Sequence, residues 1–290
     1  MSEKKFVIVT DTNADFPDEY LKNHGLGRLC LSFSVNGKTF CADKDVIDEH
    51  AFYDQMRAGA DVKTMQVNPE QAKSYFEQYL KDGIEVLYLA FSSGLSGSYN
   101  SAIIAAEELK ESYPDLRVAV IDTLCASLGQ GLLTHYAVTM KEAGKSLDEI
   151  ASWVEKNKLH LCHMFTVDDL NHLYRGGRVS KTTAMLGTVL NIKPLLHVDD
   201  EGKLIPLSKV RGRKQSLIGL VNMMEERIGS YHNELFFISH GDCLEDAKFV
   251  AAEVQKRFGI QKHLINFVGP TIGAHSGPGT VALFFLGEKR

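Results

Sequence analysis

The chain has 290 residues, 44% of them hydrophobic, and a formal net charge of −5 at pH 7. This apolar content suffices for one large core or two ordinary ones, and the negative charge gives no general attraction to nucleic acid. The N-terminus stops being apolar at Asp11, too early for a secretory signal, and no later stretch is apolar for long enough to cross a bilayer. We therefore expect a soluble, cytoplasmic protein that is not embedded in a membrane.

Apolar runs at residues 6–9, 86–91 and 118–121 are each followed by a polar turn and a longer amphipathic segment. This alternation predicts a parallel α/β sheet in the first half of the chain. Between the first two runs, the dipeptide Asn36-Gly37 favours a tight hairpin turn joining strands at residues 29–35 and 38–41.

Cysteine usage argues against both disulfides and metal binding. The chain has five cysteines at irregular spacing: Cys30, Cys41, Cys125, Cys162 and Cys243. An odd number without a Cys-x-x-Cys pair predicts free thiols in a reducing compartment. The nearest candidate for a metal site is residues 160–163, but a strand would place Cys162 and His163 on opposite faces. We expect no metal ion and no cofactor.

The second half of the chain has a different pattern. Ser146 and Glu149 have the spacing of a capping box, which predicts a helix ending near residue 156 and a lobe boundary near residue 160. A hairpin of residues 192–198 and 203–207, strands at 235–239, 264–268 and 281–285, and helices at 213–228 and 244–258 follow. We predict two lobes, an α/β domain with a parallel sheet over residues 1–160 and an α+β domain over 161–290, with a ligand between them.

A serine- and glycine-rich loop at residues 92–98 lies between a predicted strand and a helix predicted from residue 102. Backbone N–H groups at a helix start, together with hydroxyls, favour binding of an anion. Two alternatives remain: a solvated turn, or a serine hydrolase with Ser96 as nucleophile and His275 as base, because residues 94–98 differ at one position from the Gly-x-Ser-x-Gly elbow. The five serines of residues 92–101 and the absence of an evident acid partner favour the binding surface.

Four further segments are candidates for a polar site. The turn at residues 10–15 follows the first strand, where ligands of α/β sheets bind, but it is equally typical of an Asx turn. Residues 174–180 place two glycines between arginines, which fits either an anion site or a helix C-cap. Residues 275–279 form a rigid turn carrying a histidine. The basic cluster at residues 209–214, at a predicted helix start, indicates either an anionic partner or a solvated face.

Together these segments resemble the DegV family of bacterial fatty-acid-binding proteins, over nearly the whole chain. The matching stretches are residues 10–17, Thr64 with Gln66, residues 92–99, Asp122, residues 170–180, residues 192–194 and residues 275–279. Two departures are Met65 and Val67 around Gln66, where the family commonly has Ser and Pro, and Thr12-Asn13, where it has Ser-Thr. The first of these departures can reshape a pocket.

The resemblance implies a two-lobed protein, not itself an enzyme, that holds one long-chain fatty acid in a buried tunnel. Some members of the family are the acyl-binding subunit of a fatty acid kinase and present the carboxylate to a separate ATP-binding protein, which forms an acyl phosphate. By the same resemblance, Arg178 would support the head-group site and Arg211 would meet the kinase. The residues expected to bind the carboxylate are Thr64, Ser93, Gly94, Ser96, His275 and Ser276.

A fatty acid site of this kind is physically reasonable. Burial of an acyl chain contributes about 0.8 kcal/mol per methylene, so the tail can supply most of the affinity. Neutral hydroxyl and N–H donors then satisfy the carboxylate without a strong ion pair, which leaves it available for phosphorylation.

Overall fold

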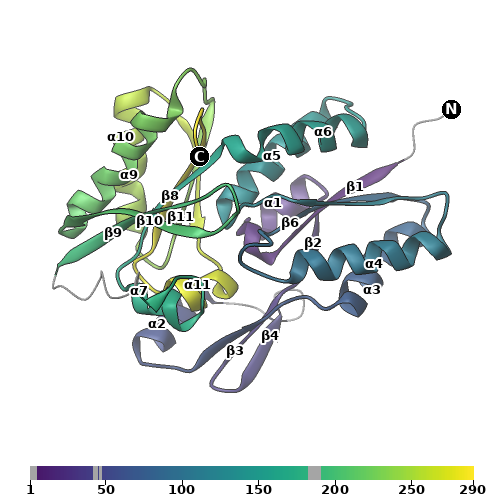
Figure 1. Ribbon diagram of the computed structural model, residues 1–290, viewed down its shortest axis with the longest axis horizontal. Helices are drawn as coiled ribbons and strands as arrows, with labels where there is room; N and C mark the ends of the chain where they lie inside the picture. The colour runs from purple at the N-terminus through teal and green to yellow at the C-terminus, as the bar shows by residue number, and fades with distance from the viewer. Residues whose placement is uncertain (1–4, 42–44, 46–47, 182–190) are drawn as a thin grey trace.

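The structure is a computed structural model that describes residues 5–41, 45, 48–181 and 191–290, and the strands of these residues form three sheets (Figure 1). Sheet A is parallel and has the strand order β2-β1-β6-β7. Its strands are β1 (Phe6–Asp11), β2 (Gly27–Leu29), β6 (Glu85–Ala90) and β7 (Val118–Asp122). The predicted parallel sheet is therefore confirmed.

Alternate residues of sheet A face two different hydrophobic clusters. Val9 and Tyr88 pack with α3 and α4, whereas Ile8 and Leu87 pack on the other face with α5. This two-residue alternation is what a strand buried on both faces requires. The helices of this half of the chain are α1 (Asp18–Asn23), α2 (Glu49–Arg57), α3 (Pro69–Lys81), α4 (Ser98–Ser112), α5 (Leu128–Glu142) and α6 (Leu147–Asn157), with short 3₁₀ turns η1 (Thr12–Ala14) and η2 (Lys158–His160).

Sheet C is mixed and has the order β10-β9-β8-β13-β11-β12, in which only β11 and β12 are a parallel pair. Its strands are β8 (Leu161–Thr166), β9 (Ile192–Val198), β10 (Leu204–Arg211), β11 (Leu235–His240), β12 (Lys262–Phe267) and β13 (Val281–Leu286). The helices are α7 (Leu170–Arg175), α9 (Arg213–Ile228), α10 (Leu244–Phe258) and α11 (Pro270–Ser276). The predicted boundary at residue 160 falls directly before β8, the first strand of this sheet.

Helix α5 lies between sheets A and C and packs against both (Figure 1). Nine of its residues are buried, which is more than one face of a helix can hold. Close approach to sheet C requires Gly129, because a Cβ there would lie 2.2 Å from His163 Nε2. The two lobes therefore share one continuous core across this helix.

Sheet B is a small antiparallel sheet of β3 (Ser32–Val35), β4 (Lys38–Cys41) and β5 (Val62–Met65) at the edge of the molecule (Figure 1). Asn36 and Gly37 both have positive φ, as the predicted tight turn requires. The expected single strand at residues 29–35 is wrong, because the chain changes sheets within it. Leu29 pairs with β1 in sheet A, whereas Ser32 pairs with Cys41 in sheet B.

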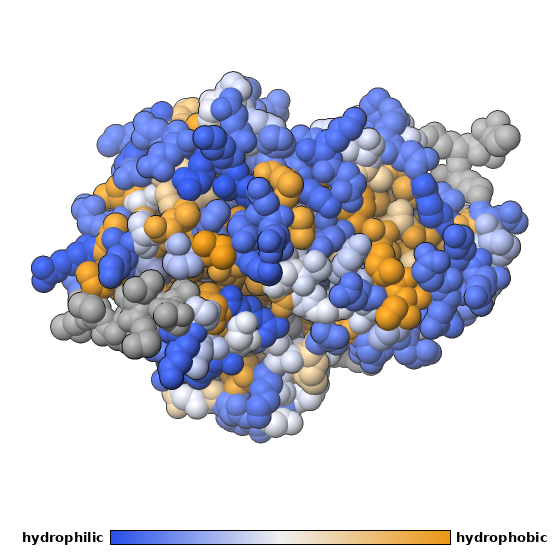
Figure 2. Space-filling view, viewed as in Figure 1, coloured by the Kyte–Doolittle hydropathy of each residue, from blue (hydrophilic) through white to orange (hydrophobic). Residues whose placement is uncertain are grey.

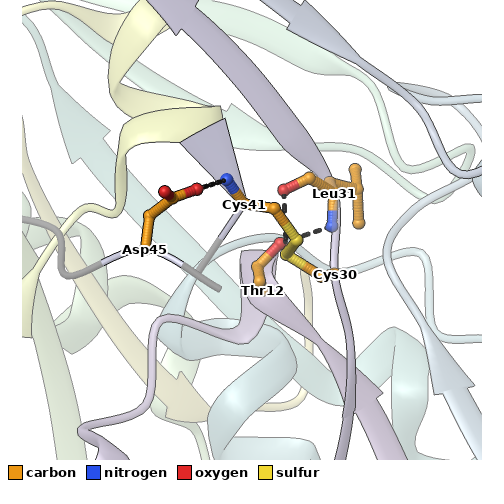
Figure 3. Close-up of a disulfide and its surroundings, with 5 residues drawn as sticks. All are labelled: Thr12, Cys30, Leu31, Cys41 and Asp45. Atoms are coloured by element: carbon orange, nitrogen blue, oxygen red, sulfur yellow. Dashed lines mark hydrogen bonds between the residues drawn. A yellow bond between two sulfur atoms is a disulfide. The ribbon is translucent and has the colours of Figure 1, made fainter. Parts of the chain in front are cut away.

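The prediction that all five cysteines are free thiols is also wrong. Cys30 and Cys41 form a disulfide across a sequence separation of 11 residues (Figure 3), whereas Cys125, Cys162 and Cys243 are free. The pairing follows from the register of the hairpin, which puts Cys41 opposite Ser32, two residues from Cys30. The bond joins the segment between sheets A and B to the end of β4.

The basic cluster at residues 209–214 extends from a strand into a helix. Lys209 and Arg211 belong to β10, and α9 begins at Arg213, as predicted; Arg213 pairs with Asp246 at 2.7 Å. The β-hairpin is longer than expected because β10 pairs with β9 as far as Ile192.

The surface offers little continuous apolar area on the face shown in Figure 2, where hydrophilic residues predominate and hydrophobic ones form separate groups. Large exposed apolar side chains such as Ile104, Leu207 and Leu244 belong to different elements. Within the described residues, no helix has the length and apolar character needed to span a membrane.

Candidate functional site

A partly open cavity of about 1360 Å³ is lined by strands of sheets B and C and by the loops that follow the strands of sheet A. Apolar side chains from both lobes form much of the wall, among them Phe91, Phe165, Leu173, Val198 and Phe284. A cavity of this size and lining accommodates a long apolar ligand.

The polar end of the cavity is formed where β5 meets the last turn of α11. Thr64 Oγ1 and His275 Nε2 lie 2.8 Å apart. The next residue, Ser276, also lines the cavity, and its buried hydroxyl has no hydrogen-bond partner among the described residues. A buried hydroxyl without a partner is costly, so a ligand acceptor at this point would be stabilising.

His275 is held as a neutral imidazole. Burial, together with a smaller contribution from the nearby Arg178 guanidinium, lowers the pKa of His275 to about 4. The ring packs against Gly176, where a Cβ would lie 2.1 Å from Nδ1. His275 thus offers the cavity a hydrogen-bonding ring without a charge.

Arg178 joins the two lobes at this end of the cavity. Its Nε and Nη2 atoms donate to the carbonyl oxygen of Leu95 at 3.2 and 3.0 Å, and Nη1 donates to the carbonyl of Gly176. Burial lowers the pKa of Arg178, although the side chain stays cationic. The residue therefore fixes the serine loop against the turn after α7 and places a positive charge near His275.

The serine loop at residues 92–98 is held by its own hydroxyls and by neighbouring elements. Ser96 Oγ lies 3.0 Å from Ser98 Oγ and accepts the N–H of Ser98, and Gly97 N–H donates to Gln66 Oε1 at 3.1 Å. The N–H of Ser93 donates to Asp122 Oδ1 at 3.1 Å. Helix α4 begins at Ser98, four residues before the predicted start.

The geometry does not favour the serine hydrolase alternative. The Nε2 atom of His275 faces Thr64, and the hydroxyl of Ser96 faces Ser98. No hydrogen bond joins Ser96 to His275 in the part of the chain that the structure describes. A serine nucleophile needs its base within hydrogen-bond reach, so this pair is not arranged as a catalytic one.

Most of the predicted site residues lie on one cavity, although two do not. The predicted residues that line it are Thr64, Ser93, Ser96, Arg178, His275 and Ser276. The N–H of Gly94 is already donated to Ser92 Oγ, and a Cβ at Gly94 would lie 2.6 Å from the carbonyl oxygen of Glu201. Gly94 therefore permits close packing of the β9–β10 turn. Arg211 is exposed at the end of β10, outside the cavity wall.

The turn after β1 is an Asx turn in which Asp11 accepts the N–H of Asn13 at 3.0 Å. The other carboxylate oxygen of Asp11 accepts from Tyr88, Phe91 and Gln130. Asp11 thus organises the loops at the carboxyl end of sheet A. These hydrogen bonds account for its buried carboxyl without a contact to a ligand.

Sequence reasoning missed a second polar group in the cavity wall. Ser127 and Ser239 line the cavity, and their hydroxyls lie 2.8 Å apart. Ser127 also bonds to the carboxyl of Asp15, a buried residue whose pKa is raised to about 8 by burial. No local pattern indicates this pair, because 112 positions separate the two serines.

The fold and the cavity define a class of protein: two lobes of mixed α and β structure that share a core helix and line a large, mainly apolar cavity with polar groups in its wall. The family model for "Uncharacterised protein, DegV family COG1307" matches residues 5–288, and the chain belongs to this family. A DegV domain-containing protein of Clostridium perfringens is 47% identical over 288 residues, covering 99% of both chains. One from Lactococcus lactis is 38% identical, covering 98% of both.

Solved structures agree with this assignment. A fatty-acid-binding DegV family protein from Thermus thermophilus has a TM-score of 0.86 at 28% identity and covers 98% of this chain and 99% of its own. A fatty-acid-binding DegV family protein from Streptococcus agalactiae has a TM-score of 0.85 at 28% identity and covers 99% and 100%. The α/β fold predicted from the sequence is therefore that of this family.

Proposed function

We propose that this protein binds one long-chain fatty acid, with the acyl chain in the cavity and the carboxylate at Thr64, His275 and Ser276. The observation that carries the proposal is the Thr64–His275 pair on the wall of a largely apolar cavity of about 1360 Å³, next in the chain to Ser276, whose buried hydroxyl has no partner among the described residues. The fatty-acid-binding relatives from Thermus thermophilus and Streptococcus agalactiae support it.

In this proposal the serine loop completes the head-group site. Ser96 and Ser93 line the cavity and can contribute hydroxyls to the carboxylate, whereas Gly94 is left out because its N–H is already donated. Arg178 acts through the carbonyl groups that it fixes and through its charge near His275.

The finer part of the proposal is that the protein presents its bound fatty acid to an ATP-binding kinase protein in the cytoplasm. A carboxylate held mainly by neutral donors stays nucleophilic enough to attack a phosphoryl group, and this chain would contribute binding rather than catalysis. Arg211 is exposed on the C-terminal lobe and is the residue we assign to contact with that partner.

Mass spectrometry of the denatured protein, purified from a lipid-containing host, tests the binding. We expect one long-chain fatty acid per chain. Displacement of a fluorescent fatty acid should then show that Thr64→Val and Ser276→Ala weaken binding about tenfold, because each removes a hydrogen bond to a charged group. Thr139→Val, at an exposed position of α5, is the control and should bind normally. Absence of both co-purified lipid and saturable binding would overturn the proposal.

The kinase role needs a separate measurement. With a DegV-partner kinase and ATP, Arg211→Ala should keep its fatty acid affinity and form less acyl phosphate. Arg117→Ala, an exposed arginine on the other lobe, should behave as the unaltered protein. Equal acyl phosphate formation by the two variants would remove Arg211 from the assignment.

A further inference from the structure

Two serine hydroxyls in the cavity wall lie away from the proposed head-group site. Ser127 immediately precedes α5, and Ser239 belongs to β11, so the pair joins the two lobes. Their oxygens are 2.8 Å apart, both residues line the cavity, and both are buried. The Oγ of Ser127 is also bonded to the carboxyl of Asp15.

The position of this pair along the cavity follows from α11. Asp15 Oδ1 accepts the N–H of Gly269, the residue before α11, at 2.9 Å, whereas His275 is in the last turn of the helix. Six residues of helix rise about 9 Å. A fatty acid whose carboxylate lies at His275 would therefore pass the serine pair with a middle part of its chain.

A count of the protons shows that the side chains of Asp15, Ser127 and Ser239 can make one further hydrogen bond. Each serine has one proton. If Asp15 is ionised, Ser127 donates to it and Ser239 donates to Ser127, which leaves Ser239 able to accept. If Asp15 is neutral, it donates to Ser127, Ser127 donates to Ser239, and the proton of Ser239 has no further acceptor in the described part of the chain. Burial raises the pKa of Asp15 to about 8, so the second arrangement predominates at neutral pH.

Three neighbouring polar atoms of the cavity wall are paired within the protein. Asn13 Oδ1 accepts from Thr271 at 2.6 Å, and His163 Nε2 accepts the N–H of Ala126 at 3.1 Å. The Nδ1 atom of His163 lies 3.0 Å from a backbone carbonyl. The ring of His163 therefore has both of its nitrogens occupied and is not available to a ligand oxygen.

The backbone of Ser127 supports a specific role for its hydroxyl. Its φ of 54° and ψ of −147° lie in a region that favours glycine, and a serine there costs on the order of 1–3 kcal/mol. A glycine would relieve that strain but would leave Asp15 and Ser239 unconnected.

We propose that Ser239, supported by Ser127 and Asp15, binds an oxygen substituent on the acyl chain, so that mid-chain hydroxy fatty acids bind more tightly than unsubstituted acids of equal length. This inference rests on the proposed function. An unsubstituted chain can still bind, because the serines retain the hydrogen bond to each other.

The test compares stearic acid with a series of hydroxystearic acids whose hydroxyl moves along the chain, by displacement of a fluorescent fatty acid. We expect one position, or two adjacent ones, to bind about three- to tenfold more tightly than stearic acid, the ratio that one added neutral hydrogen bond gives. Ser239→Ala should lose this advantage and keep its affinity for stearic acid. Ser216→Ala, a buried serine of α9 outside the cavity wall, should retain the advantage.

The outcomes of this test distinguish a failure of this inference from a failure of the proposed fatty acid binding. Normal binding of stearic acid with no favoured hydroxyl position in the unaltered protein would overturn the inference alone, without any variant. A preference that persists in Ser239→Ala would overturn it as well. Failure of stearic acid itself to bind would instead overturn the proposed function.

Discussion

The Nε2 atom of His275 lies 2.8 Å from the hydroxyl of Thr64, which brings the end of α11 against an edge strand of sheet B. The contact joins residues 211 positions apart and lies at the polar end of the cavity. Its geometry depends on Gly176, which makes room for the imidazole ring.

Gly176→Ala should weaken fatty acid binding while leaving the fold intact. Gly176 has a helical φ of −73°, so an alanine is not strained, but its Cβ would meet His275 Nδ1 at 2.1 Å and displace the ring from Thr64. We expect an affinity loss of about tenfold, measured by titration with a fluorescent fatty acid.

The adjacent Gly177 provides the matched control. A Cβ there meets nothing within 4 Å, but its φ is +74°. Gly177→Ala should therefore cost about 1 kcal/mol or more in unfolding free energy and leave the affinity unchanged. If the two variants lose affinity equally, the position of His275 is not what the first substitution disturbs.

Arg178→Lys should destabilise the protein and accelerate release of the fatty acid. A lysine keeps the charge but cannot donate in parallel to Leu95 and also reach Gly176. We expect a loss of about 1–2 kcal/mol in chemical denaturation, together with faster dissociation in stopped-flow displacement. Arg117→Lys, an exposed position, should change neither quantity, and unchanged dissociation in Arg178→Lys would show that the bridge does not retain the ligand.

The parallel sheet and the hairpin turn could be predicted because their signals are local. The short apolar run of β1, buried at every position after Phe6, and the positive-φ pair Asn36-Gly37 depend on residues a few positions apart. The predicted polar segments follow strands or end helices, which is why so many of them face one cavity. Family resemblance, rather than spacing, supplied the residue Thr64.

Contacts between distant segments could not be predicted in the same way. Ser127 meets Ser239 because α5 packs between two sheets, and no periodicity encodes that arrangement. The Cys30–Cys41 bond was missed because an odd number of cysteines indicates free thiols but does not exclude that two of them pair. The change of sheet after Leu29 follows from competition between two sheet edges for one segment.

Reduction of the disulfide should lower the unfolding free energy by about 3 kcal/mol, as expected for closing a loop of this length. Denaturation with and without a reductant measures the change, and thiol counting of the denatured, unreduced protein should find three free cysteines. A double variant, Cys30→Ser with Cys41→Ser, should have the lower stability and no response to reductant. Five reactive thiols would show that the bond does not form in solution.

Asp15→Asn should remove a pH dependence of stability. The pKa of Asp15 is raised from 3.8 to about 8 in the folded protein, so between these values the native state holds a proton that the unfolded state has released. Stability from this group is therefore present at low pH and is lost as pH rises toward 8, by up to about 1.4 kcal/mol per pH unit.

Asparagine reproduces the neutral carboxyl, because its oxygen can accept from Gly269 and its amide can donate to Ser127. The difference in unfolding free energy between the unaltered protein and Asp15→Asn should therefore shrink, and then reverse in favour of the variant, as pH rises. His240 and His275, whose pKa values burial lowers to about 4, make both proteins less stable as pH falls below about 6.5, so their effect cancels in the difference. Parallel stability curves for the two proteins between about pH 5 and pH 8 would mean that Asp15 is ionised, and Ser239 would then act as an acceptor in the cavity rather than a donor.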